Sequence, residues 1–149
     1  MTTQPSDPPT HRGGGGRFVR AAARVLATAG LAVDAYLHAH LADRFDTITS
    51  DISQGTLFRL EASLAALAAL LVLFWRRLPG DLFAAAVATG GLALLLVYRY
   101  VNVGELGPIP DMYEPLWYEE KQTAAVAQAV AALAMLYLLL TRRFRRSAY

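Results

Sequence analysis

The chain has 149 residues, enough for one domain of ordinary size. Hydrophobic residues make up 55% of it and charged residues 17%, whereas a soluble domain usually carries about 25% charged residues. This composition favours a membrane protein. The chain has no cysteine, which excludes disulfides, thiolate metal sites and a cysteine nucleophile.

Residues 1–17 contain three prolines and the glycine run Gly13 to Gly16, with almost no apolar side chains. Such a segment cannot bury enough surface to offset its ordering entropy, so we expect a disordered cytoplasmic tail. A phosphate-binding loop is the alternative. It is disfavoured because the GxxxxGK[ST] spacing is missing and no strand precedes the glycines.

Four apolar stretches follow, at about residues 18–41, 57–75, 82–101 and 121–140. A helix needs roughly 17–25 mostly apolar residues to cross a bilayer, and all four stretches are that long. A soluble four-helix bundle would instead need a polar face on each helix, which residues 62–75 and 124–140 lack. The sequence therefore predicts an all-α bundle of four transmembrane helices within residues 18–141.

The charges predict the orientation of this bundle. Ten of the 14 basic residues flank the start of the first stretch, the turn between the second and third, and the end of the fourth. The acidic residues gather in the other two connections. Since arginine and lysine mark the cytoplasmic side, we expect a multi-pass plasma-membrane protein with both termini in the cytoplasm. The basic tail, residues 142–149, then serves as a topology anchor beside anionic lipid, and we expect no nucleic-acid binding.

Cleavage of the first stretch as a signal peptide is an alternative, since Val33-Asp34-Ala35 offers small residues around a cleavage point. The apolar stretch continues past that point to Leu41, so we favour retention as a membrane span.

Ionisable residues fall at the outer ends of the predicted spans. Asp34 is placed about 10 Å deep at 1.5 Å per residue, and His38 follows one helical turn nearer the outside on the same face. The other spans bring further polar groups to this leaflet, while the inner halves read as almost purely Ala, Leu and Val. The predicted outer-leaflet polar cluster comprises Asp34, His38, Arg59, Glu61 and Arg99.

Three interpretations of this cluster compete. We favour a structural cluster, in which Asp34 accepts hydrogen bonds or pairs with Arg59 or Arg99. The second is an outward-opening site that binds a cation, such as zinc or manganese, or handles protons through Asp34, His38 and Glu61. The third is a haem site, which typically takes two axial ligands from His, Met or Cys. It is disfavoured because only His38 and His40 lie near a span and Met135 belongs to the inner half of the fourth.

Small residues suggest where helices approach closely. Ala86 and Gly90 are spaced as small-xxx-small with Gly91 beside them, and Ala127 and Ala131 repeat the spacing in the fourth stretch. The glycine pair makes Ala86, Gly90 and Gly91 a candidate surface for another helix of the chain, a protein partner or a second copy.

The second outer loop, residues 102–120, combines glycines and prolines with Tyr113, Trp117 and Tyr118. Proline stiffens a loop and aromatic rings suit the level of the lipid headgroups. We therefore expect an ordered cap over the polar cluster.

Three segments together resemble a group of uncharacterised small four-helix integral membrane proteins of actinobacteria. They are VDAYLHAHLADRFD (33–46), ISQGTLFRLEASLAAL (52–67) and YVNVGELGPIPDMYEPLWYEEK (100–121). The resemblance covers most of residues 20–140. It implies a four-helix fold and a membrane location, and it carries over no catalytic residue.

The sequence lacks GxSxG, HExxH and GxGxxG motifs, so it offers no catalytic residue or cofactor site, and we expect a non-enzyme. The favoured function is that of a small accessory or interaction protein in the lipid bilayer. The alternative is a component that binds or transports a cation, a proton or a small solute through the outward-facing polar cluster.

Overall fold

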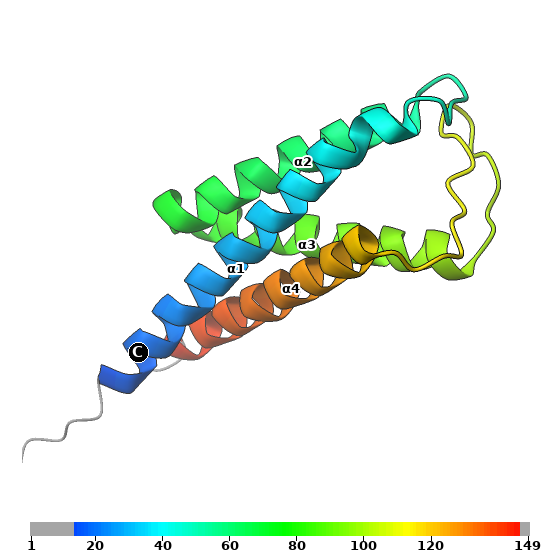
Figure 1. Ribbon diagram of the computed structural model, residues 1–149. Helices are drawn as coiled ribbons and strands as arrows, with labels where there is room; N and C mark the ends of the chain where they lie inside the picture. The colour runs from blue at the N-terminus through cyan, green and yellow to red at the C-terminus, as the bar shows by residue number, and fades with distance from the viewer. Residues whose placement is uncertain (1–13, 147–149) are drawn as a thin grey trace, which may run out of the picture.

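The computed structural model describes residues 14–146, and over that range it consists of helices and connections without a β-strand (Figure 1). The helices are α1 (Gly14–Leu41), the 3-10 turn η1 (Ala42–Phe45), α2 (Gln54–Leu70), the π-helical turn η2 (Leu71–Trp75), α3 (Leu78–Tyr100) and α4 (Glu119–Arg146). Four segments are long and apolar enough to cross a membrane: Gly14–Phe45, Gln54–Trp75, Leu78–Tyr100 and Glu119–Arg142. The predicted all-α fold of four long apolar helices is confirmed.

Helix α1 packs most extensively against α4 and α2, and α3 completes the bundle against α4 (Figure 1). Helices α1 and α4 approach closely at Gly30 of α1, where an added Cβ would lie 2.6 Å from the backbone oxygen of Ala127 and 3.1 Å from the Cβ of Ala131. The small-residue pair of α4 therefore packs inside the bundle. Larger side chains, Leu31, Met135 and Leu138 among them, fill the core toward the chain termini.

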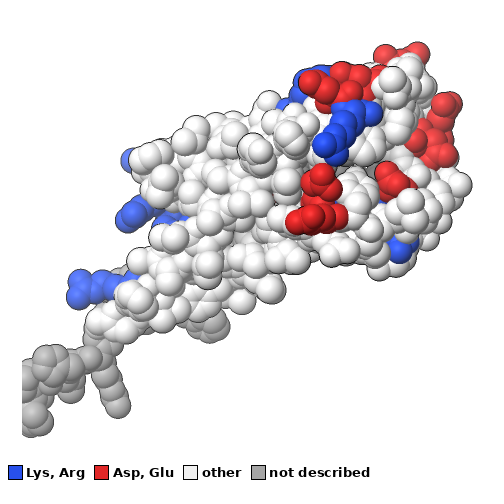
Figure 2. All heavy atoms as spheres, viewed as in Figure 1, with Lys and Arg blue, Asp and Glu red and all other residues white. Residues whose placement is uncertain are grey.

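The two ends of the bundle differ in charge (Figure 2). We call the end formed by the connections 42–53 and 101–118 the acidic end, because the acidic side chains gather there. We call the opposite end, formed by the start of α1, the α2–α3 connection and the last turns of α4, the basic end. White apolar and uncharged surface separates the two in Figure 2.

The helices run further than the sequence pattern predicts. Gly14–Arg17, assigned above to a disordered tail, form the first turn of α1, and α4 continues through Arg146. The glycine run predicted disorder because it was considered by itself. In the structure these glycines continue a helix that is packed in the bundle from Ala23 onward. The rest of the two predicted tails, 1–13 and 147–149, lies outside the described residues.

Two local devices set the ends of α2. Ser53 begins it as an N-cap, its Oγ accepting a 3.0 Å hydrogen bond from the Thr56 amide. At the other end the chain widens into η2, where the Arg76 amide donates to the oxygen of Leu71, five residues back. Arg76 has a left-handed φ of 46° and stops the helix there.

The two connections at the acidic end contact each other. The Ile52 amide donates to the oxygen of Pro108 at 3.1 Å, and the Glu114 amide donates to the oxygen of Tyr98 at 3.0 Å. Gly104 and Gly107 turn the α3–α4 connection through left-handed backbone conformations. This connection therefore passes over the ends of α2 and α3.

Candidate functional site

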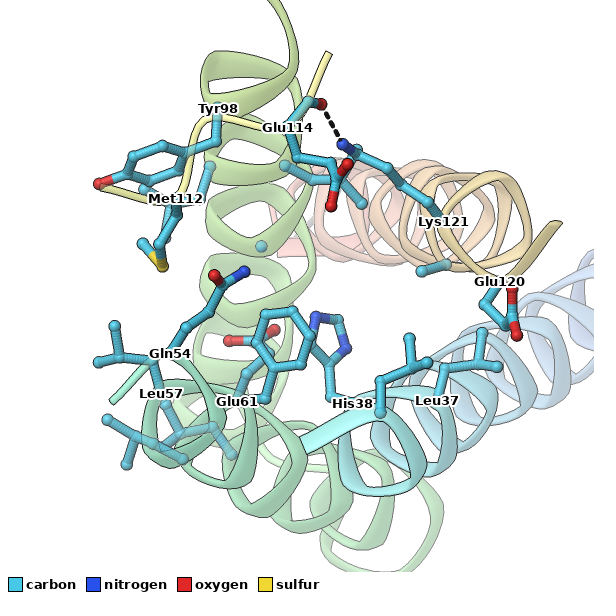
Figure 3. A pocket seen from close by; sticks show the side chains of 18 of the residues that line it. Leu37, His38, Gln54, Leu57, Glu61, Tyr98, Met112, Glu114, Glu120 and Lys121 are labelled. Atoms are coloured by element: carbon cyan, nitrogen blue, oxygen red, sulfur yellow. Dashed lines mark hydrogen bonds between the residues drawn. The ribbon is translucent and has the colours of Figure 1, made fainter. Parts of the chain in front are cut away.

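A cavity of about 350 Å³ lies at the acidic end, between all four helices and beneath the α3–α4 connection (Figure 3). Its walls are mostly leucine and aromatic side chains. They include Leu37, Leu41, Leu57, Phe58, Leu60, Leu64, Leu94, Leu95 and Tyr98, with Ile109 and Met112 from the connection above. Apolar walls with a few polar groups are typical of small-molecule sites.

A group of polar side chains behind the cavity wall centres on Asp34, which is fully buried and does not line the cavity itself. His38 lies one turn further along α1, with its Nδ1 3.0 Å from Asp34 Oδ1 and 3.0 Å from the Asp34 backbone oxygen. Both neighbours are acceptors, so the proton of the imidazole sits on Nδ1. The i,i+4 spacing thus produces the Asp34–His38 contact that the sequence predicts.

A second donor reaches Asp34 from α4. Gln128 is 1% exposed, and its Nε2 donates to Asp34 Oδ1 at 2.9 Å. Gln128 was not among the residues predicted for the cluster, although a side-chain amide within the otherwise apolar residues 124–140 is a usable signal for a buried polar contact.

Glu61 of α2 completes what we call the Asp34 cluster, namely Asp34, His38, Glu61 and Gln128. The Glu61 carboxyl interacts directly with Asp34 and His38. Gly91 leaves room for it: an added Cβ at this glycine would lie 2.7 Å from Glu61 Oε1 and 2.6 Å from Gln128 Nε2. Gly91 therefore faces the interior of the chain, while the Cβ position of Gly90 is open.

The cluster has more acceptors than donors. Within the part of the chain that the structure describes, four buried oxygens near the cavity have no hydrogen-bond partner: Asp34 Oδ2, Glu61 Oε1, Gln128 Oε1 and Gln54 Oε1. The donors His38 Nδ1 and Gln128 Nε2 both point at a single atom, Asp34 Oδ1. A buried oxygen without a partner is costly, so these oxygens favour a neighbour that donates hydrogen bonds.

Polar side chains also line the cavity near its mouth (Figure 3). Lys121 Nζ donates to the Glu114 backbone oxygen at 2.5 Å and lies 5.8 Å from the centre of the Tyr118 ring. Burial, together with Glu114 and Glu120, raises the pKa of Tyr118 to about 12. The Tyr118 hydroxyl consequently stays protonated across the physiological range.

Two arginines of the predicted cluster lie elsewhere, so the expected pairing of Asp34 with Arg59 or Arg99 is wrong. Arg59 donates instead to Asp43 and Asp46 of the α1–α2 connection, each at 2.7 Å. Arg59 lies nearer the acidic end than Asp34 does. The η1 turn, which contains Asp43 and ends at Asp46, brings both carboxylates to the Arg59 side chain. Arg99 lies over the Tyr100 ring, 4.9 Å from its centre, and over Trp117.

The metal interpretation of Asp34, His38 and Glu61 also fails. Among residues 14–146, no group of three or more His, Cys, Asp or Glu side chains is placed to hold a metal ion.

A second buried polar group, which the sequence analysis missed, lies at the basic end. Asp81 of α3 is 1% exposed and accepts from both terminal nitrogens of Arg24, at 3.1 and 3.2 Å, and from Arg142 at 3.2 Å. Arg24 also donates to the Val72 oxygen in η2 at 3.0 Å. The inner half of the bundle is therefore not purely apolar, and this ion pair network joins α1, η2, α3 and α4.

Comparison with known proteins adds no assignment to this geometry: no protein-family model, no curated protein and no solved structure matches the chain. The class defined by fold and site is a helical bundle with four potential membrane spans and a cavity beside a buried carboxylate cluster.

Proposed function

We propose that the chain is a multi-pass plasma-membrane protein with both termini in the cytoplasm, and that it binds a small amphipathic organic molecule in the cavity. The observation that carries the proposal is an apolar-walled cavity whose lining includes two buried oxygens without a hydrogen-bond partner, Glu61 Oε1 and Gln54 Oε1. A volume of about 350 Å³ falls in the range of small-molecule sites, roughly 300–1,000 Å³.

The charges support the orientation. The basic end carries the arginines that accompany cytoplasmic loops, so the cavity opens at the outer leaflet. The accessory role favoured by the sequence does not call for a cavity of this kind, whereas binding of a small solute does.

The rest of the core favours binding over conduction. Beyond Asp34 toward the basic end, Ala27, Leu31 and Met135 are fully buried and packed together. Packed side chains leave no route for a solute past the cluster in this conformation.

The test is whether a molecule copurifies with the protein. We expect a stoichiometric small molecule, extracted from protein purified in nanodiscs and detected by mass spectrometry. Ala124→Phe should remove it, because Ala124 lines the cavity and a larger ring would occupy that space. Val126→Phe is the matched control, since Val126 is 63% exposed on the same helix. Wild-type protein without a bound molecule, or equal amounts in both variants, would contradict the proposal.

A further inference from the structure

The Asp34 cluster contains two carboxyl groups, and the basic side chain beside them is His38. Among the described residues, hydrogen bonds to Asp34 come from a neutral amide and an imidazole, and no arginine or lysine hydrogen bond to Glu61 is present. Lys121 shares the cavity, but its Nζ donates to the Glu114 backbone oxygen beside the Tyr118 and Trp117 rings. Buried carboxylates require either protons or a cationic partner.

The unpartnered buried side-chain atoms of the cavity lining and of the Asp34 cluster are all acceptors, whereas Arg99 Nε, a buried donor without a hydrogen-bond partner, belongs to neither group. Asp34 Oδ2, Glu61 Oε1, Gln128 Oε1 and Gln54 Oε1 lack donors, and Asp34, Gln54 and Gln128 are each at least 95% buried. An anionic or acceptor-rich head group would add acceptors to this set. A protonated amine brings up to three N–H donors and a positive charge, which meets both needs at once.

The surface around the mouth of the cavity has a net negative charge. Around the acidic end the sequence places eight acidic side chains outside the cluster against four basic ones, and red surface dominates that end in Figure 2. Glu114 and Glu120 line the cavity itself. A mouth of negative charge raises the local concentration of cations.

The walls of the cavity indicate the polarity of the rest of the ligand. Leucine, phenylalanine and tyrosine side chains surround the space above Glu61 and His38 (Figure 3). They favour an apolar body, and the Phe58 ring, which packs edge-on against His38 at 5.1 Å between centres, offers an aromatic surface beside the cluster.

From these observations we infer that the ligand is a cationic amphiphile, a protonated amine on an apolar body, with its nitrogen at the Glu61 carboxyl, where the Asp34 cluster meets the cavity. This inference rests on the proposed function, whose cavity it uses, and adds the charge and donor character of the ligand.

Three probes with one apolar body test it: 4-phenylbutylamine, 4-phenyl-1-butanol and 4-phenylbutyrate. Each is titrated into the full chain in nanodiscs by calorimetry, with empty nanodiscs as the reference for partitioning into lipid. We expect the amine to bind at least about tenfold more tightly than the alcohol, and the carboxylate to bind most weakly, because the amine alone brings a positive charge to the carboxyl groups.

Glu61→Gln should abolish the preference for the amine over the alcohol, because it removes the charge that distinguishes the two probes. Glu105→Gln is the matched control, because it removes the same charge from an exposed position of the α3–α4 connection outside the cavity lining. Asp34→Asn is the second variant if Glu61→Gln does not fold, and it too should lose the preference.

Equal affinities for amine and alcohol, or tightest binding of the carboxylate, would overturn the inference and leave the proposed function intact. Absence of binding by all three probes would overturn it as well. The copurification experiment with Ala124→Phe then decides separately whether the cavity binds some other molecule.

Discussion

Gln128 of α4 donates from Nε2 to Oδ1 of Asp34 in α1, at 2.9 Å and across 94 positions of the chain. His38 uses the same oxygen, which leaves Oδ2 of Asp34 and Oε1 of Glu61 both buried and both without a donor. The contact therefore links two helices and at the same time concentrates every donor of the cluster on one side of the carboxylate.

This arrangement predicts that Asp34→Asn stabilises the protein. An asparagine oxygen in place of Oδ1 still accepts from His38 and Gln128, while the new amide nitrogen supplies the donor that Glu61 lacks. Removing an unpartnered buried acceptor is worth about 1–3 kcal/mol, so the melting temperature in detergent should rise.

Asp34→Leu is the control for that variant. It leaves the donors of His38 and Gln128 without an acceptor, and the melting temperature should fall by the equivalent of about 1–3 kcal/mol. A lower melting temperature for Asp34→Asn would show that the cluster needs the charge of Asp34, contrary to the geometry.

At the basic end, replacing an aspartate by asparagine should lower the stability of the protein instead of raising it. Asp81→Asn removes the charge that pairs with Arg24 and Arg142, leaving two arginines in a largely buried position. Breaking a buried ion pair costs on the order of 3–5 kcal/mol, so thermal unfolding should occur at a markedly lower temperature. Partial recovery in Asp81→Asn combined with Arg24→Met would attribute the loss to the stranded charge; an unchanged melting temperature in the single variant would contradict the role of the network.

The fold was accessible from the sequence because long apolar stretches and the segregation of arginine depend on composition alone. The Asp34–His38 contact was accessible too, since i,i+4 neighbours meet on any helix. The contacts between helices could not be predicted from the sequence. Whether Gln128 or an arginine reaches Asp34 depends on how each helix is rotated and how closely Gly30 lets α4 approach, which spacing along the chain does not specify.

Asp81 was missed for a related reason. The pattern assigns it to a turn between spans, but α3 begins already at Leu78 and buries Asp81 in its first turn. The partner Arg24 lies in a different helix, 57 positions away, and the π-helical turn that offers it the Val72 oxygen has no signature in the apolar run 71–75.

The neighbouring glycines of α3 give a matched pair of substitutions. Gly90→Ala meets open space, so the lower backbone entropy of the unfolded chain should stabilise the protein by roughly 0.5–1 kcal/mol. Gly91→Ala displaces Glu61 and Gln128 and disturbs the bond to Asp34, so it should gain less or lose stability. Thermal unfolding of the two variants compares them directly, and a greater gain for Gly91→Ala would contradict the placement of the cluster.

At the acidic end, hydrogen bonds from Arg59 lower the pKa of Asp46 below its ordinary value of 3.8. The unfolded chain therefore binds the proton more readily, so the pair stabilises the fold above about pH 4 and its contribution disappears as the pH falls through the lowered pKa. We expect Asp46→Asn to melt below the wild type at pH 7 and to converge with it in acid, the difference at pH 7 shrinking in high salt because the pair is exposed. A difference that persists in strong acid would assign the effect of the variant to something other than the charge of Asp46.

The orientation can be tested with single cysteines, since the native chain has none to interfere. Thr49 and Glu105 are exposed in the two connections of the acidic end, and Arg77 is exposed in the α2–α3 connection. In intact cells, Thr49→Cys and Glu105→Cys should react with a membrane-impermeant maleimide, whereas Arg77→Cys should react only after permeabilisation, because nine other basic residues still hold that side in the cytoplasm. Labelling of Arg77→Cys in intact cells together with protection of Thr49→Cys would invert the protein, so that the cavity and its carboxylates would open toward the cytoplasm and take their ligand from there.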